Sequence, residues 1–236
     1  YKQRITQFAN QGLTFSVKDQ GSLEGEIIIL FHGFPQRASC WDKVTEQLNK
    51  EGYRTLVFDQ RGYAPTARPK GRKAYKVANL AVDVVALIDA TGEKSVHLVG
   101  HDWGSFVGWT VVGYYPEKIR TWTSISLPHP KAFARSLFSS KQALHSGYMF
   151  FFQLPWFPEK MFINLKNIRK KQLADGRMNK ALIERYEKEM VEENALPGGI
   201  NWYRAFPYFG KTHKAIVPTT HIWGTHDTSL ERKGAE

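Results

Sequence analysis

The stretch that decides the fold is Val99-Gly100-His101-Asp102-Trp103-Gly104-Ser105. An apolar run over 95–99 leads into it, and small residues, including Gly108, lead out of it. This order is typical of a buried strand, a tight turn and a helix that packs closely on a sheet. The central pattern, G-x-D-x-G, has the form of a nucleophile elbow with aspartate at the position more often held by serine. We therefore expect the Asp102 side chain to project from the carboxyl edge of a sheet.

An aspartate at this position favours a particular chemistry. A free Asp side chain has a pKa of about 3.9, so its carboxylate is ionised at neutral pH and needs no base to act as a nucleophile. It suits displacement at saturated carbon, as in an epoxide or an alkyl halide, better than attack on an ester. The alternative is structural, because Asp at a strand-to-helix turn is often a helix N-cap.

Around the elbow, short apolar runs alternate with helix-like segments. Strands are predicted over 26–31, 54–59, 96–99 and 119–125. Helices are predicted over 41–49, 77–90 and 103–114, and the first places Trp41, Val44 and Leu48 on one face. Repeated strand-helix-strand units imply an α/β fold with a largely parallel sheet and helices on both faces. Sites in such sheets gather at the carboxyl ends of the strands.

The alternation stops in the second half of the chain. From 129 to 214 the sequence is aromatic, basic and helical, without a clear strand pattern. A strand pattern returns over 215–223. We therefore expect a core over 1–128 that resumes over 215–236, with a helical insertion over 129–214 between its two parts.

Composition and charge limit which cellular compartment and which binding partners are expected. The single cysteine, Cys40, and the lack of a long apolar stretch at the N-terminus favour a cytoplasmic location. The longest aromatic cluster, over 148–157, is about half as long as a membrane span, so no span is predicted. The net charge of +11 comes largely from 131–214, where basic residues mix with acids as on a solvated helix face. No nucleic-acid partner, metal or organic cofactor is expected, and the oligomeric state stays open.

Two further segments carry residues suited to the same chemistry. Phe31-His32-Gly33-Phe34-Pro35 follows the first buried strand, and its composition predicts a tight loop that permits a cis peptide bond at the proline. Such a loop can direct the Phe34 N–H toward the elbow, where the Trp103 N–H would complete an oxyanion hole. Trp223-Gly224-Thr225-His226-Asp227 follows the last apolar run, and Asp227 could orient a catalytic histidine. The alternatives are an ordinary turn and a helix-capping Asp.

Together, 32–35, the loop Asp59-Gln60-Arg61-Gly62-Tyr63, the elbow and 224–227 resemble the α/β-hydrolase-fold epoxide hydrolases and the related haloalkane dehalogenases. The resemblance covers nearly the whole chain, with the motifs in the same order. It implies an α/β-hydrolase fold in which the insertion is a helical lid above the nucleophile. It also implies the chain order nucleophile, acid, histidine, and a structural role for the 59–63 loop.

The resemblance further implies which residues hold the substrate. Epoxide hydrolases polarise the ring oxygen with two lid tyrosines, and the segments 147–155 and 201–204 place these at Tyr148 and Tyr203. A phenol stays protonated at pH 7, so it can donate a hydrogen bond to a developing alkoxide. Further substrate contacts are implied at His32, Pro35, Phe151 and Trp202.

The implied reaction converts a small apolar epoxide and water to a vicinal diol. Asp102 forms an ester with an epoxide carbon, and a histidine oriented by Asp227 activates the water that hydrolyses this ester. Two alternatives stay open. The first is a dehalogenase, in which the Trp103 indole stabilises departing halide. The second is a ligand-binding homologue that lacks catalysis.

The catalytic histidine itself is missing from this chain. The family places it on a loop beyond the acid, and no histidine follows Asp227. The histidines present all come earlier, and none occupies the matching position: His32, His97, His101, His129, His145, His213, His221 and His226. We expect the last strand, the last helix and the catalytic loop to be absent from this sequence, whose start without Met is also expected to be trimmed.

Overall fold

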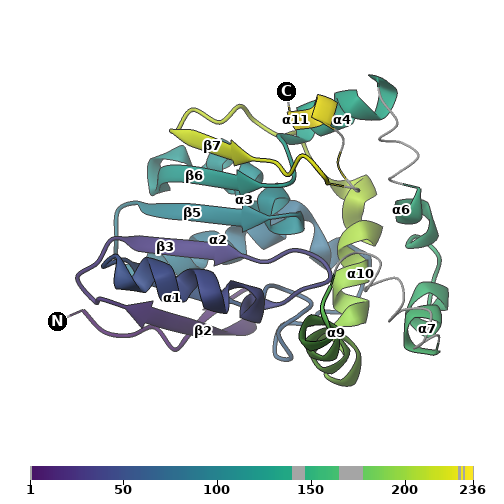
Figure 1. Ribbon diagram of the computed structural model, residues 1–236, viewed down its shortest axis with the longest axis horizontal. Helices are drawn as coiled ribbons and strands as arrows, with labels where there is room; N and C mark the ends of the chain where they lie inside the picture. Colours follow the sequence, from purple (N-terminus) through teal and green to yellow (C-terminus); the bar gives the residue numbers. More distant parts are fainter. Residues whose placement is uncertain (1, 140–146, 165–177, 228–229, 231, 236) are drawn as a thin grey trace.

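One mixed sheet forms the centre of the protein (Figure 1). The computed structural model describes residues 2–139, 147–164, 178–227, 230 and 232–235. The strands within them are β1 Gln7–Asn10, β2 Leu13–Gly21, β3 Ile27–Phe31, β4 Arg54–Phe58, β5 Val96–His101, β6 Ile119–Ile125 and β7 Thr219–Ile222. They lie in the order β1-β2-β4-β3-β5-β6-β7. The β1–β2 and β2–β4 pairs are antiparallel, and all pairs from β4 to β7 are parallel.

The parallel part of the sheet agrees with the apolar runs of the sequence. Every residue of β3 and β4 is buried, because parallel strands are covered on both faces. The predicted strands are confirmed, and β7 lies within the predicted 215–223 run. The β1–β2 hairpin was not predicted. Its longer strand alternates between more and less exposed side chains, as a one-sided strand at the edge of a sheet does, and contains no apolar run.

Helices cover both faces of the sheet, as predicted (Figure 1). Helix α1, Asp42–Lys50, lies on one face, while α2, Val77–Thr91, and α3, Trp103–Tyr114, pack against each other on the other face. The predicted buried face of α1 is wrong for Val44, which is 42% exposed. Trp41 belongs to the preceding 3₁₀ turn η1, Ala38–Trp41, whose tighter winding breaks the 3.6-residue periodicity. The shorter elements are η2 Arg72–Tyr75, η3 Pro116–Lys118 and α11 Arg232–Ala235.

In its described residues, the insertion between β6 and β7 contains helices joined by turns and loops, and no strand. Its elements are α4 Pro130–Ser139, α6 Tyr148–Phe151, α7 Phe157–Asn164, α9 Lys180–Tyr186, the π-helix η4 Glu187–Glu192, α10 Leu196–Ala205 and η5 Phe206–Tyr208. In Figure 1, α10 lies beyond the arrowheads of the parallel strands. None of the helices in the described part of the chain is long and apolar enough to cross a membrane.

Helix α10 is seated on the 59–63 loop of the core. The Nε1 atom of Trp202 donates a 2.8 Å hydrogen bond to the carbonyl oxygen of Arg61. Gly198 approaches Gly62 so closely that a Cβ on Gly198 would lie 1.9 Å from the Gly62 oxygen. Arg61 itself is buried and pairs with Asp83 of α2 at 2.8 Å. These contacts give the loop a structural role, and they fix the height of α10 above the sheet.

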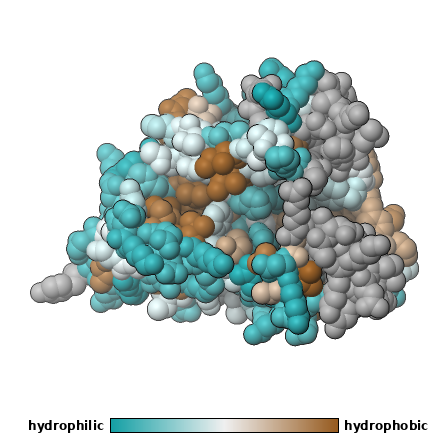
Figure 2. Space-filling view, viewed as in Figure 1, coloured by the Kyte–Doolittle hydropathy of each residue, from teal (hydrophilic) through white to brown (hydrophobic). Residues whose placement is uncertain are grey.

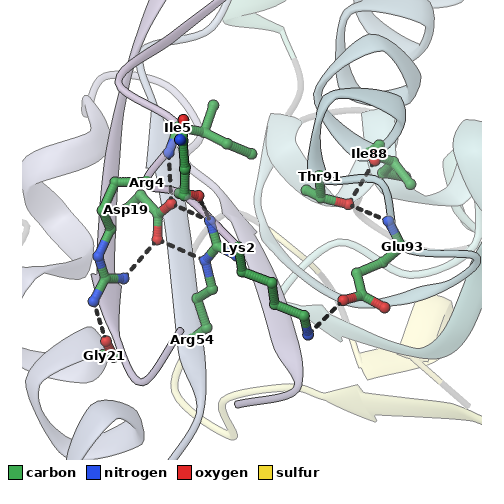
Figure 3. A network of polar contacts seen from close by, with 10 residues as sticks. Lys2, Arg4, Ile5, Asp19, Gly21, Arg54, Ile88, Thr91 and Glu93 are labelled. Atoms are coloured by element: carbon green, nitrogen blue, oxygen red, sulfur yellow. Dashed lines mark hydrogen bonds and ion pairs between the residues drawn. The ribbon is translucent and has the colours of Figure 1, made fainter. Parts of the chain in front are cut away.

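A buried ion pair ties the N-terminal segment to β2 and β4 (Figure 3). The Arg54 Nε atom donates a 2.9 Å hydrogen bond to Asp19, and both side chains are almost fully buried. Asp19 also accepts hydrogen bonds from the Arg4 side chain and from the N–H of Ile5. Burial alone would raise the pKa of Asp19, but these donors outweigh it and hold the pKa below its usual value of 3.8.

The face that carries α1 has a smaller core of its own, built from Ile28, Leu30, Ala38, Trp41 and Val57. Val99 and Ile125 pack at its edge and are only partly buried, and Ile222 on β7 is 49% exposed. Figure 2 shows apolar surface on this side of the molecule, next to the polar surface of α1. The opposite face of the sheet, under α2 and α3, carries the larger cluster of buried apolar residues.

Candidate active site

Asp102 occupies the turn between β5 and α3. Its backbone has φ 54° and ψ −122°, a conformation that costs a non-glycine residue about 1–3 kcal/mol and persists only where the surroundings impose it. Here the Asp102 N–H donates to the Ile125 oxygen at 3.2 Å, and its carbonyl accepts from the Ser105 N–H at 2.9 Å. The turn thus holds the carboxylate at the carboxyl edge of the sheet, as the elbow pattern predicts.

The loop after β3 reaches the Asp102 carboxylate. The Phe34 N–H donates a hydrogen bond to Oδ1 of Asp102 at 2.9 Å, and the Phe34–Pro35 peptide bond is cis. Gly33 makes this approach possible, since a Cβ there would lie 2.5 Å from the Cβ of Asp102. The Trp103 N–H also bonds the carboxylate. Both amides predicted for an oxyanion hole therefore lie at the Asp102 carboxylate.

The electrostatics of Asp102 result from opposing effects. Burial raises the pKa of its carboxyl above the ordinary 3.8, and the negative charge of Asp227 acts in the same direction. The charge of His101 and the N–H groups of Trp103 and Phe34 lower it. The carboxylate is thus desolvated and held by directed donors, an arrangement that leaves it reactive toward an electrophilic carbon.

Two tyrosines from the insertion meet at this carboxylate. Tyr148 of α6 and Tyr203 of α10 lie edge to face, with ring centroids 5.7 Å apart, and the Tyr203 ring also packs on Trp103 at 4.8 Å. Desolvation, and then the charge of Asp102, raise the pKa of Tyr148 to about 12, although 44% of the residue's surface is exposed. Burial raises the pKa of Tyr203 well above 10. Both phenols are therefore protonated hydrogen-bond donors at neutral pH.

Asp227 lies beyond β7 at the same edge of the sheet. Its Oδ2 accepts a 2.6 Å hydrogen bond from the Ser126 hydroxyl, and its Oδ1 accepts from the Leu230 N–H at 2.9 Å. These contacts hold the carboxylate near the end of β6, close enough for its charge to affect the Asp102 pKa. Its neighbour His226 is exposed. His145 lies outside the described residues.

A small cavity of about 50 Å³ joins Asp102 with Tyr148 and Tyr203, and Asp227 is not part of its lining. Its lining consists of Asp102, Trp103, Phe106, Leu127, Phe133, Tyr148, Met149, Tyr203, Phe206 and Leu230. The aliphatic and phenylalanine members were not predicted from the sequence. Phe106 could have been predicted from the sequence. It follows Trp103 by three residues on the predicted helix, so both side chains lie on the same helix face. The others come from separate segments, and only the tertiary fold brings them together.

Four residues predicted to contact the substrate do not line this cavity. His32 is fully buried, and its Nε2 accepts a 3.1 Å hydrogen bond from the Gln60 N–H. Trp202 is fully buried too, because its indole bonds the Arg61 carbonyl. Phe151 packs against Phe157, and Pro35 follows the cis peptide bond in the loop after β3.

The described residues contain no group of three or more His, Cys, Asp or Glu side chains that could hold a metal ion. Among the described residues that line the cavity, the ionisable side chains are one carboxyl group, that of Asp102, and two phenols, those of Tyr148 and Tyr203.

The α/β-hydrolase fold family matches residues 26–234 of the chain. Human epoxide hydrolase 4 is 34% identical over 96% of the chain and 66% of its own length, so the chain spans about two thirds of that relative. The AB hydrolase superfamily protein YfhM of Bacillus subtilis is 32% identical over 98% of the chain and 84% of its own length. The crystal structure of epoxide hydrolase VrEH1 from Vigna radiata aligns with a TM-score of 0.74 at 29% identity, covering 90% of this chain and 76% of that one.

Proposed function

The chain belongs to the α/β-hydrolase fold family, and from this premise we propose that it converts small apolar epoxides to vicinal diols through an ester on Asp102. One observation carries the proposal: the Asp102 carboxylate shares a cavity with the side chains of Tyr148 and Tyr203. A nucleophile opposite two protonated phenols suits a strained ring that needs attack at carbon and hydrogen bonding at oxygen. The epoxide hydrolase relatives support the same reading.

In the first half-reaction, a carboxylate oxygen of Asp102 forms a bond to one epoxide carbon while the carbon–oxygen bond of the ring breaks. The electron pair of that bond passes to the ring oxygen. Tyr148 and Tyr203 donate hydrogen bonds to this developing alkoxide, which takes up a proton that is finally supplied by solvent water. Their raised pKa values keep them protonated for this role.

In the second half-reaction, water adds to the ester carbonyl carbon of Asp102. The negative charge that develops on the carbonyl oxygen is met by the amides of Phe34 and Trp103, which already point at the carboxylate. The ester carbon–oxygen bond then breaks, the leaving oxygen takes up the proton that the base removed from the water, and the diol leaves. This step needs a general base, and we propose a histidine oriented by Asp227. No histidine occurs among the described residues that line the cavity.

The helical insertion acts as a lid in this proposal. It supplies both tyrosines, and with Met149 and Phe206 it covers the nucleophile. Excluding bulk water strengthens the hydrogen bonds to the alkoxide and protects the ester from uncontrolled hydrolysis. A cytoplasmic location is proposed on the single cysteine alone.

The test is incubation with styrene oxide, followed by mass spectrometry of the protein and assay of the diol. We expect either an adduct on the peptide that contains Asp102 or diol in solution, and neither with Asp102→Asn. In heavy-oxygen water, label should enter the Asp102 carboxylate after repeated turnovers. Full diol production by Asp102→Asn would contradict the proposal. Halide release from a bromoalkane without reaction of styrene oxide would favour a dehalogenase instead.

A further inference from the structure

One arginine near the candidate active site bonds two carboxylates from different parts of the fold. Arg37 lies two residues after Pro35, and only 11% of its side chain is exposed. Its Nε and Nη2 atoms donate hydrogen bonds of 2.9 and 2.5 Å to Oδ2 of Asp59, the residue that follows β4. Its Nη1 atom pairs with Glu193, which follows η4 in the insertion. A single guanidinium therefore joins the loop after β3, the core beyond β4 and the helical insertion.

The backbone of the loop after β3 is fixed by the same core carboxylate. Oδ1 of Asp59 accepts a 2.9 Å hydrogen bond from the N–H of Ala38. Earlier in the loop, the Gln36 N–H donates a hydrogen bond to the Gly33 carbonyl oxygen at 2.9 Å and closes a turn. Phe34 lies inside this turn, so its position depends on how the loop is held at residues 37 and 38.

The insertion also bonds this segment of the core. The Arg185 side chain of α9 donates a 3.0 Å hydrogen bond to the carbonyl oxygen of Ser39. The Nη1 atom of Arg37 lies 3.5 Å from the carbonyl oxygen of Glu189 in η4, besides its pairing with the Glu193 side chain. Residues 37–39 are thus attached to the insertion at residues 185, 189 and 193.

The charges of this bridge persist at neutral pH. Burial alone would lower the pKa of Arg37, but the hydrogen bonds and the charges of Asp59 and Glu193 outweigh it and raise the pKa above its ordinary value. Burial alone would raise the pKa of Asp59, but the hydrogen bond and the charge of Arg37 hold it below 3.8. The planar fork of a guanidinium lets separate N–H groups reach both carboxylates at once.

Phe34 connects this loop to both sides of the cavity at Asp102. Its N–H donates a hydrogen bond to the Asp102 carboxylate, and its ring packs edge to face on Tyr203, with ring centroids 5.3 Å apart. The same ring packs on Phe152 of the insertion at 5.6 Å. A displacement of the loop would therefore move the amide away from Asp102 and change the packing of Tyr203.

We propose that Arg37 is a positioning residue that holds Phe34 in place. One of its carboxylate partners belongs to the core and the other to the insertion. Arg37 therefore keeps the Phe34 amide at Asp102 and the Phe34 ring against Tyr203 at the same time. The inference rests on the proposed function and adds a residue to it. Arg37 does not line the cavity and takes no part in bond making.

The first test measures the loop without any reaction, by hydrogen exchange in the full chain. We expect the amides of residues 33–38 to exchange at least about tenfold faster in Arg37→Gln, the effect of losing one hydrogen bond to a charged group. Glu193→Gln removes only the partner in the insertion and should show a smaller increase. The matched control is Lys18→Gln, which removes the same charge from the same groove but breaks only an exposed pair with Asp42. It should exchange as the wild type does, and an equal increase in this control would contradict the proposal.

The second test follows the modification of Asp102 by styrene oxide as a function of pH. We expect Arg37→Gln to react about 100-fold more slowly at pH 7, as for a misplacement of about 1 Å. The Phe34 amide lowers the pKa of Asp102, so its loss should also move the acid limb of the pH profile to higher pH by about one unit. A loss of stability alone would leave this limb in place. The other groups that face Asp102 are the same in both proteins: His101, Asp227, Tyr63, Tyr148 and Tyr203.

A double variant separates the effect of position from the effect of charge. Arg37→Gln/Glu193→Gln has the net charge of the wild type, since it loses one charge of each sign. If Arg37 acts by position, the double variant keeps the slow rate and the displaced limb of Arg37→Gln, because Glu193 acts through Arg37. A return of the limb to its wild-type pH would show a charge effect and would overturn the proposal.

The outcomes distinguish this inference from the proposed function. A wild-type chain that reacts with no epoxide would refute the proposed function, while hydrogen exchange would still test the bridge. Normal reaction of Arg37→Gln, with an unmoved acid limb, would refute only the positioning role. If Arg37→Gln does not fold, Glu193→Gln provides the test, because its carboxylate is 41% exposed. This variant should slow the reaction about fivefold, the size of one partly exposed ion pair, and wild-type behaviour in both measurements would overturn the proposal.

Discussion

The backbone N–H of Phe34 donates a 2.9 Å hydrogen bond to Oδ1 of Asp102, although the two residues are 68 positions apart in the chain. The contact depends on Gly33, whose missing side chain leaves room for the Asp102 side chain. The carboxylate is therefore oriented by the fold before any substrate binds. This preorganisation reduces the cost of reaching the transition state.

Replacing Gly33 by Ala should disturb this geometry. The new Cβ would lie 2.5 Å from the Cβ of Asp102 and 2.6 Å from its Oδ1, so the loop has to move. We expect the rate of Asp102 modification by styrene oxide to fall about 100-fold, as for a misplacement of about 1 Å. Overpacking should also lower stability by about 1–3 kcal/mol. Gly224→Ala, whose Cβ would meet nothing within 4 Å, should leave both measurements unchanged.

Asp102→Asn should abolish the reaction and stabilise the fold. The pKa of Asp102 is higher in the folded chain than the unfolded value of about 3.9, so burying its charge destabilises the folded state at neutral pH. Removing such a charge typically adds about 0.5–2 kcal/mol. The penalty is absent below pH 3.9 and complete above the folded pKa. The advantage of the variant in thermal unfolding should therefore grow from about pH 4 to pH 7, and a constant difference would contradict the assignment.

The raised pKa of Tyr148 should extend the first half-reaction to higher pH. Its pKa of about 12 means that the phenol keeps its proton far beyond the ordinary value of 10. The rate of Asp102 modification should therefore stay level between about pH 8 and pH 10, where an unperturbed tyrosine would begin to ionise. Tyr148→Phe and Tyr203→Phe should each slow the reaction about 100-fold, within the usual range for a lost acid-base group. Tyr114→Phe, whose hydroxyl bonds the Lys211 carbonyl at the surface, serves as a control.

Asp19 should make the fold sensitive to acid. Its pKa is lower in the folded chain than in the unfolded one, so its contribution to stability is complete above pH 3.9 and is lost as pH falls through the folded pKa. Asp19→Asn leaves buried Arg54 without its charged partner and should cost about 3–5 kcal/mol in urea unfolding at pH 7. Asp89→Asn breaks the exposed pair with Lys118 and should cost at most about 1 kcal/mol. Equal losses would contradict the burial argument.

The sequence by itself determined the order of the core elements and the position of Asp102 in the turn between β5 and α3. The predictions of β3 and β4 hold because these strands are buried at every residue, whereas β5 and β6 alternate between buried and less buried residues. The elbow is recognisable because a tight strand-to-helix turn needs small residues at fixed positions. The sequence pattern did not predict the β1–β2 hairpin, because its longer strand alternates as an edge strand does and contains no apolar run.

The tertiary structure alone decided what surrounds Asp102. His32 and Trp202 lie within the sequence motifs, but their ring nitrogens form hydrogen bonds with the backbone of Gln60 and Arg61, and neither residue lines the cavity. Phe133 and Phe206 come from distant parts of the insertion and become neighbours of the nucleophile only after folding. Local patterns specify strands and turns because backbone conformation is a short-range property. The walls of a cavity are set by long-range packing, which a linear pattern does not encode.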